Sequence, residues 1–128
     1  MRLLLDTHVL LWALSEPARI PDPVAQALVD PGNEVVVSAA TVWEIAIKQS
    51  LGKLQLPGPV EVWLFDAMAQ TGLGWIDVSP EVAAGVRALP WHHRDPFDRI
   101  LVSHASAGHT LVTHDAAFRP YGVPILWL

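Results

Sequence analysis

Short apolar runs alternate along this chain with segments typical of helices. The runs that predict strands are Arg2–Leu5, Glu34–Val37, Trp75–Val78, Thr110–Thr113 and Pro124–Trp127. The predicted helices are Thr7–Leu14, Pro23–Val29, Ala40–Leu51, Val60–Gln70, Pro80–Leu89 and Phe97–Ala107. Strands that alternate with helices imply an α/β fold with a parallel sheet covered on both faces. The strands agree with this fold, because they are continuously apolar rather than alternating.

Residues that commonly begin or end helices mark most of these boundaries. Four side chains are expected as N-caps, namely Asp22, Ser38, Ser79 and Asp95, and a proline follows Asp22 and Asp95 at the first helical position. Three glycines are expected where helices end, namely Gly52, Gly72 and Gly108. These helix-boundary residues therefore support the same order of helices and strands.

Four acidic residues from distant parts of the sequence are expected at one edge of the sheet. Asp6 directly follows the first strand, and Asp115 comes two residues after the strand that ends at Thr113. Glu44 lies about one turn into the helix after the second strand, and Asp98 lies in the first turn of a later helix. Ligands of such folds bind beyond the carboxyl ends of the strands. The spacing thus predicts a carboxylate site there.

Each acid also has a purely structural interpretation. Asp6 is placed to cap a helix, and Asp115 to cap the short turn after it. Glu44 is placed to pair with Lys48 four residues later, although its other neighbours are apolar. Asp98 would complement a helix dipole. Carboxylates that meet repel one another by roughly 4 kcal/mol per pair at 4 Å, so a cluster raises its own pKa values or recruits cations.

Composition narrows the class of protein. The 128 residues, 52% of them hydrophobic, suit one domain with a real core. No cysteine is present, which excludes disulfides and thiolate chemistry and fits a reducing cytoplasm. No apolar run is long enough to predict a membrane span.

Charge bears on the substrate. A net charge of -5 argues against a simple polyanion-binding module. An acidic protein acts on an acidic substrate when divalent cations lie between them, and carboxylate oxygens without cysteine favour Mg²⁺ or Mn²⁺.

At this point four segments together resemble the PIN-domain family, and within it the VapC-type toxins of toxin–antitoxin pairs. The first is Leu3-Leu4-Leu5-Asp6-Thr7-His8, and the second is Ser38-Ala39-Ala40-Thr41-Val42-Trp43-Glu44-Ile45. The third is His93-Arg94-Asp95-Pro96-Phe97-Asp98-Arg99-Ile100-Leu101, and the fourth is Leu111-Val112-Thr113-His114-Asp115. Their order and spacing cover the whole chain as one domain, 1–128.

The resemblance implies a three-layer α/β/α sandwich with a central parallel sheet. It implies a Mg²⁺-dependent endoribonuclease, with Mn²⁺ as a substitute, that forms a homodimer and is inhibited by a cognate antitoxin. By position, the catalytic and metal-binding quartet is Asp6, Glu44, Asp98 and Asp115, of which Asp6 and Asp98 are the strongest metal ligands. Thr7 and Thr113 match small hydroxyl positions that orient carboxylates or water.

Other polar residues leave alternatives open. Arg99 either contacts a substrate phosphate or pairs with a quartet carboxylate, and Lys48 either lines an RNA groove or lies on a solvated face. The six histidines show no His-x-x-x-His pair, so histidine metal ligation is not expected, although His114 is placed to touch substrate and His8 to lie on a helix surface.

The six tryptophans are expected mainly in the core or an interface, with base stacking as the minority interpretation. Two other functions remain open: a non-catalytic interaction module with the same fold, and a metal-dependent DNA nuclease or phosphohydrolase.

Overall fold

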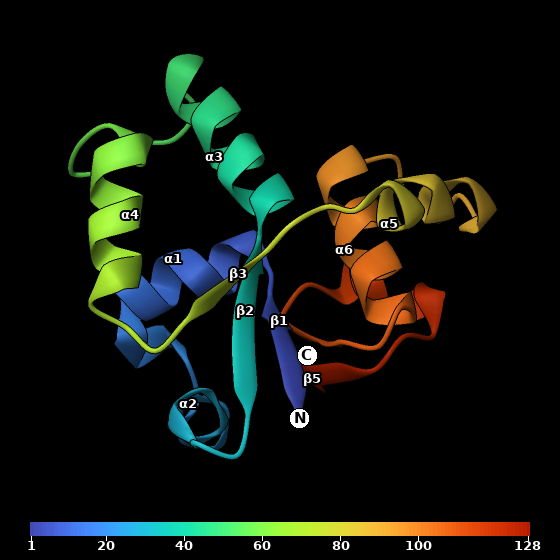
Figure 1. Ribbon diagram of the computed structural model, residues 1–128, viewed down its shortest axis with the longest axis horizontal. Helices are drawn as coiled ribbons and strands as arrows, with labels where there is room; N and C mark the ends of the chain where they lie inside the picture. The colour runs from blue at the N-terminus through green and yellow to red at the C-terminus, as the bar shows by residue number, and fades with distance from the viewer.

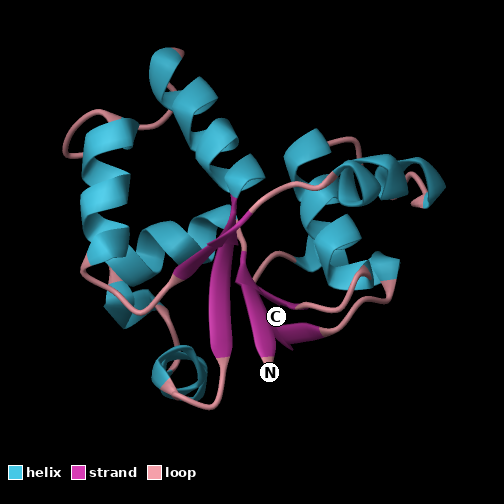
Figure 2. Cartoon of the chain, viewed as in Figure 1, coloured by secondary structure: helices cyan, strands magenta, loops and turns pink.

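The computed structural model describes all of residues 1–128 and has one five-stranded sheet at its centre (Figures 1 and 2). The strands are β1 (Arg2–Leu5), β2 (Glu34–Ser38), β3 (Gly74–Ile76), β4 (Thr110–Thr113) and β5 (Ile125–Trp127). Their order across the sheet is β3-β2-β1-β4-β5, and every pairing is parallel. The predicted parallel sheet is therefore confirmed.

Helices cover both faces of this sheet. They are α1 (Thr7–Ser15), α2 (Asp22–Val29), α3 (Ala39–Ser50), α4 (Val60–Ala69), α5 (Pro80–Gly85) and α6 (Pro96–Ser106). Short 3-10 helices span Pro17–Arg19, Val86–Ala88 and Ala116–Tyr121. In Figure 1, α1, α2 and α4 lie on one side of the strands, and α5 and α6 lie on the other. No helix has the length and apolar character that crossing a membrane requires.

Two hydrophobic cores follow from the alternation of side chains along β1. Leu3 and Leu5 point into the core that the residues of α1, α2 and α4 complete. Leu4 points to the opposite face and packs with Leu101 and Val102 of α6. All three leucines are fully buried. Because both faces of a strand are covered, each of its positions must be apolar, and the three-layer α/β/α arrangement results.

Most of the residues expected as N-caps do cap a helix, and the prediction is wrong for one of them. The side chains of Ser38, Ser79 and Asp95 accept hydrogen bonds from backbone N–H groups of the helices that follow them. Asp22, expected as a cap, is instead the first residue of α2. The carbonyl of Pro21 accepts the first helical bond, from the N–H of Ala25, so the helix begins one residue earlier than expected.

The expected strand Trp75–Val78 is also corrected. The strand is Gly74–Ile76, and its last pair joins Ile76 to Ser38 of β2. Ser38 is also the N-cap of α3, so the only neighbouring strand ends there. Beyond Ile76, the chain has no neighbouring strand with which to form backbone hydrogen bonds, so Asp77 lies outside the sheet.

Candidate active site

The structure brings the predicted acidic quartet to one edge of the sheet. Asp6 follows β1, Asp115 follows β4, and Glu44 lies on α3, which follows β2. These three strands are neighbours, so their carboxyl ends share an edge. Asp98 joins them from the first turn of α6, which packs against α3. The four distant acids thus lie at the same edge of the sheet, and their role there as a catalytic and metal-binding quartet stays a prediction.

Asp6 is held rigidly at the end of β1. Its side chain is only 4% exposed. Oδ1 accepts a 2.7 Å hydrogen bond from the backbone N–H of Val9, and Oδ2 accepts one from the hydroxyl of Thr113. Burial raises the pKa of Asp6, while these two hydrogen bonds lower it. Asp6 is thus both the cap of α1 and a member of the acidic cluster.

Glu44 is fixed by a second threonine and a lysine. Its carboxylate is buried and accepts hydrogen bonds from the hydroxyl of Thr7 and from Nζ of Lys48. The hydrogen bond to Glu44 raises the pKa of Lys48, so this ammonium stays charged. The orienting contacts expected of Thr7 and Thr113 are both present, because each hydroxyl donates to one quartet carboxylate.

Asp98 lies where the negative charges accumulate. The pKa of its carboxyl is raised to about 7, first by burial and then by nearby like charges. The carboxylates that contribute to this rise belong to Asp95, Glu44, Asp115 and Asp6. Such mutual effects require the acids to lie within range of one another's charge. Near neutral pH, the Asp98 carboxyl is therefore protonated in part of the molecules.

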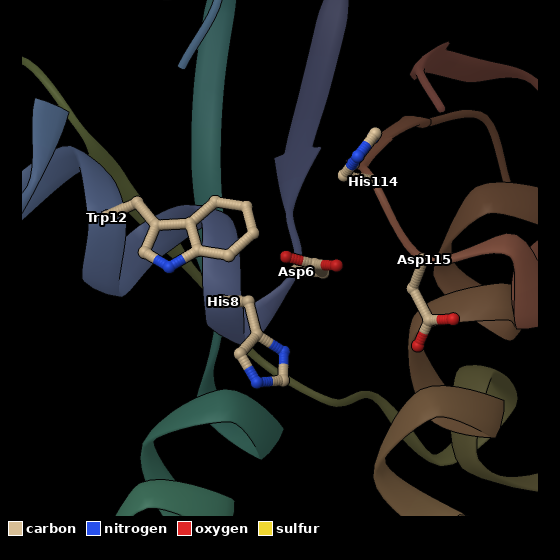
Figure 3. Close-up of a pocket in the computed structure, with 5 residues that line it drawn as sticks. All are labelled: Asp6, His8, Trp12, His114 and Asp115. Atoms are coloured by element: carbon tan, nitrogen blue, oxygen red, sulfur yellow. The ribbon is translucent and has the colours of Figure 1, made fainter. Parts of the chain in front are cut away.

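Asp115 faces the solvent side of the cluster. Its Oδ1 accepts a hydrogen bond from the N–H of Ala117, so it also caps the 3-10 helix that follows β4. Together with Asp6, His8, Trp12 and His114 it lines a pocket of about 320 Å³ (Figure 3). For Asp115 the structural and functional interpretations coexist, since Oδ1 caps the 3-10 helix and Oδ2 accepts no hydrogen bond from the chain.

The expected phosphate contact of Arg99 is wrong. Its side chain is 2% exposed, and it donates hydrogen bonds to the carbonyls of Val86, Leu89 and Pro90 and to the hydroxyl of Tyr121. No quartet carboxylate receives a hydrogen bond from it. Successive side chains on an α-helix lie about 100° apart around its axis. Arg99 therefore points away from the site that Asp98 faces and into the protein interior.

The donor set suits a hard divalent ion that keeps much of its water. No three His, Asp or Glu side chains stand ready to chelate one ion directly. Mg²⁺, however, usually binds through one or two carboxylates and retains several waters. Asp6 keeps a free lone pair on each oxygen, and the one hydrogen bond to the Asp98 carboxyl, at Oδ2, leaves Oδ1 open. The residues present therefore fit such an ion.

Sequence reasoning missed three residues at this site. Nε2 of His93 lies 3.2 Å from Oδ2 of Asp98, and its other ring nitrogen lies 2.7 Å from the hydroxyl of Tyr121. His8 and Trp12, expected on a surface and in a core or interface, both line the acidic pocket. Their spacing of two and six residues from Asp6 along a strand–helix junction is a signal that could have located them.

Comparisons with known proteins bear on the family and the fold of the chain. The family model described as PIN domain matches residues 3–123. Ribonuclease VapC22 of Mycobacterium tuberculosis is 33% identical over 123 residues, which cover 94% of this chain and 92% of that relative.

Solved structures share the fold across nearly the whole chain. One is VapBC2 from Rickettsia felis bound to a DNA fragment from its promoter, with a TM-score of 0.72, 18% identity and 98% of each chain covered. Another is VapBC-1 from nontypeable Haemophilus influenzae, with a TM-score of 0.66, 19% identity, and 99% of this chain and 98% of that one covered. At these identities the likeness is one of fold.

Proposed function

The chain belongs to the PIN-domain family, and on that premise we propose that it is a Mg²⁺-dependent endoribonuclease acting as the toxin of a toxin–antitoxin pair. The observation that carries the proposal is the meeting of Asp6, Glu44, Asp98 and Asp115 at the carboxyl edge of the sheet. The relative named Ribonuclease VapC22 supports RNA as the substrate.

Asp6, Asp98, Glu44 and Asp115 would hold the ion, with Asp6 and Asp98 the strongest proposed ligands. Mn²⁺ would substitute, because it accepts the same oxygen ligands. When bound, the ion supplies charge neutralisation for the phosphate and lowers the pKa of a water molecule. No covalent nucleophile from the chain is needed.

The chain's own contribution is to hold the carboxylates in place. Thr113 and the N–H of Val9 fix the plane of the Asp6 carboxylate. Thr7 and Lys48 fix Glu44 in the same way, and Lys48, whose side chain is 40% exposed, remains a proposed phosphate contact. Such positioning matters because small displacements of catalytic groups lower rates strongly.

A cognate antitoxin and a second copy of the chain are the proposed protein partners. The VapBC complexes among the structural relatives support an antitoxin. An apolar groove of about 510 Å³ supports an interface, since its lining includes the exposed aromatic side chains of Trp43, Phe65 and Trp75. Exposed apolar patches of this kind commonly mark protein contacts.

The purified protein is expected to cleave RNA in Mg²⁺ and to stop when EDTA is added. Asp6→Asn should lower the cleavage rate by about 100-fold or more, because a neutral amide binds the cation poorly while it still accepts the N–H of Val9. Gel analysis of structured RNAs measures both effects. Expression should arrest growth for the unchanged protein and not for Asp6→Asn.

Asp66→Asn provides the matched control, because Asp66 is exposed on α4, away from the quartet. Cleavage that persists in EDTA or in Asp6→Asn would contradict the proposed site. Intact RNA together with cleaved DNA would assign a different nuclease activity.

Mg²⁺ or Mn²⁺ is expected to raise the melting temperature, and more strongly at pH 8 than at pH 6. The ion binds only the assembled cluster, so binding stabilises the fold. Because the pKa of Asp98 is raised to about 7, a proton competes with the ion below that pH, and the apparent affinity should weaken by about tenfold per pH unit there. Thermal shift measurements at both pH values, with KCl of equal ionic strength as the control, test this. Equal shifts at both would contradict it.

A further inference from the structure

The pocket beside the acidic cluster has aromatic walls. Of the five residues that line it, His8, Trp12 and His114 carry flat rings, and the other two are Asp6 and Asp115. Figure 3 shows Trp12 and His8 on one side of Asp6 and His114 with Asp115 on the other. The rings thus flank Asp6, a proposed ligand of the metal ion. Flat walls on both sides of a pocket suit a flat ligand.

Contacts with neighbouring aromatic and basic side chains hold these rings in place. Trp127 of the edge strand β5 stacks on His114, with ring centroids 4.7 Å apart and planes 21° apart. The same Trp127 meets Trp12 edge-on at 5.8 Å, and the guanidinium of Arg19 lies 4.6 Å from the centre of the Trp12 ring. His8 leans on Trp12 with a centroid distance of 6.0 Å. A ligand would therefore meet rings already held in place, which lowers the entropy cost of binding.

The lining of the pocket lacks the basic side chains that are the usual source of RNA affinity. No lysine or arginine lines it, and the whole chain carries a net charge of -5. Proteins that hold RNA by its phosphates need a concentration of basic side chains. Stacking of bases on aromatic side chains is the other common source, and it accepts any base because every base has a flat face.

Structural roles alone do not explain the histidines. His8 and His114 are exposed, so their rings contribute little to the core, whereas Trp12 is half-buried and packs partly against it. Exposed aromatic rings that converge on a pocket beside a catalytic cluster are better explained by contact with a ligand.

We propose that His8, Trp12 and His114 form a subsite that binds one unpaired nucleobase of the RNA, next to the phosphate that is cleaved. This inference rests on the proposed ribonuclease function. A pocket of about 320 Å³ lies at the low end of ligand-sized cavities, which suits one extruded base. Recognition of splayed-out bases by aromatic rings is typical of single-stranded loops.

Binding to a non-cleavable probe tests the subsite separately from catalysis. The probe is a 2′-O-methyl RNA hexamer, used in six further versions with one abasic position each, and the readout is fluorescence anisotropy. One abasic position should weaken binding of the unchanged protein by about tenfold, which is the usual effect of one stacked base. His114→Ala should weaken binding of the intact hexamer by a similar factor.

The two losses should not add. For His114→Ala, the critical abasic position should cost nothing further, because the base has no ring left to meet, whereas a merely structural effect would leave the abasic loss intact. Trp12→Leu should behave likewise and Trp12→Phe should restore binding. Trp91→Leu is the control, since Trp91 is exposed but does not line the pocket.

If no abasic probe bound more weakly than the intact hexamer, or if the losses from the abasic position and from His114→Ala were additive, the proposed subsite would be wrong. If RNA is cleaved while no abasic probe binds more weakly, the subsite fails and the ribonuclease stands. If no RNA is cleaved while the non-additive losses appear, the subsite stands and the ribonuclease fails.

Discussion

Asp98→Asn is expected to make the metal-free protein more stable at pH 8 and to lower RNA cleavage by about 100-fold or more. The carboxylate is partly buried among like charges, so its ionised form destabilises the fold. The neutral amide has nearly the same shape without the charge. A gain in stability that accompanies a loss of function is typical of residues retained for catalysis.

The sign and pH window follow from the pKa of Asp98, which is about 7 in the folded protein against 3.8 for a free side chain. The stability gained by holding this proton is full below about pH 4 and is lost as the pH rises through 7. A pKa difference of about three corresponds to about 4 kcal/mol. Since the side chain is 22% exposed, solvent lowers this figure, and we expect about 2 kcal/mol at pH 8.

Urea denaturation in EDTA at pH 4 and pH 8 measures the effect. Asp98→Asn should exceed the unchanged protein in free energy of unfolding at pH 8 and match it at pH 4. With Mg²⁺ in place of EDTA, the unchanged protein should gain stability and Asp98→Asn should not. Asp66→Asn, an exposed acid on α4, should change stability by less than about 0.5 kcal/mol at either pH. If Asp98→Asn were less stable than the unchanged protein at pH 8, the ionised Asp98 carboxylate would not be destabilising the fold.

The sheet and the quartet could be predicted from the sequence because both follow from local rules. The unbroken apolar runs in β1 and β2 require burial on both faces, and only a parallel sheet between helix layers supplies it. Asp6 and Asp115 come just after strands, so the sheet itself carries them to one edge. Neither inference needs any distance between side chains.

The aromatic walls could not be predicted in this way. His114 is ordered by Trp127, and that contact exists only because β5 pairs with β4 at the edge of the sheet. Strand order is a property of the whole fold, and the run of residues around Trp127 does not specify its neighbour. The same holds for β3, which ends at Ile76 because β2 ends beside it.

The environment of Arg99 shows a side chain whose role depends on the fold rather than the motif. Its guanidinium binds three carbonyls in the segment 86–90, where the chain turns after α5, and it lies 3.8 Å from the centre of the Trp91 ring. It also donates to the hydroxyl of Tyr121. A planar fork with several donors suits this arrangement, and a lysine ammonium does not. Arg99 thus fastens the 86–91 segment to α6.

Arg99→Ala is accordingly expected to lower the free energy of unfolding by about 3–5 kcal/mol, because three partly buried carbonyls lose their donor and removal of the buried Arg99 side chain leaves a cavity. That loss is a large part of the roughly 5–15 kcal/mol that stabilises a typical domain. Arg99→Lys should lose much of the same stability, since one ammonium cannot reach three carbonyls. Urea denaturation followed by tryptophan fluorescence measures both variants, with Arg94→Ala as the exposed neighbouring control, expected to change stability by less than about 0.5 kcal/mol. If Arg99→Lys instead kept its stability and lost RNA affinity, Arg99 would be a phosphate contact after all, and its burial beneath Trp91 would have to open when RNA binds.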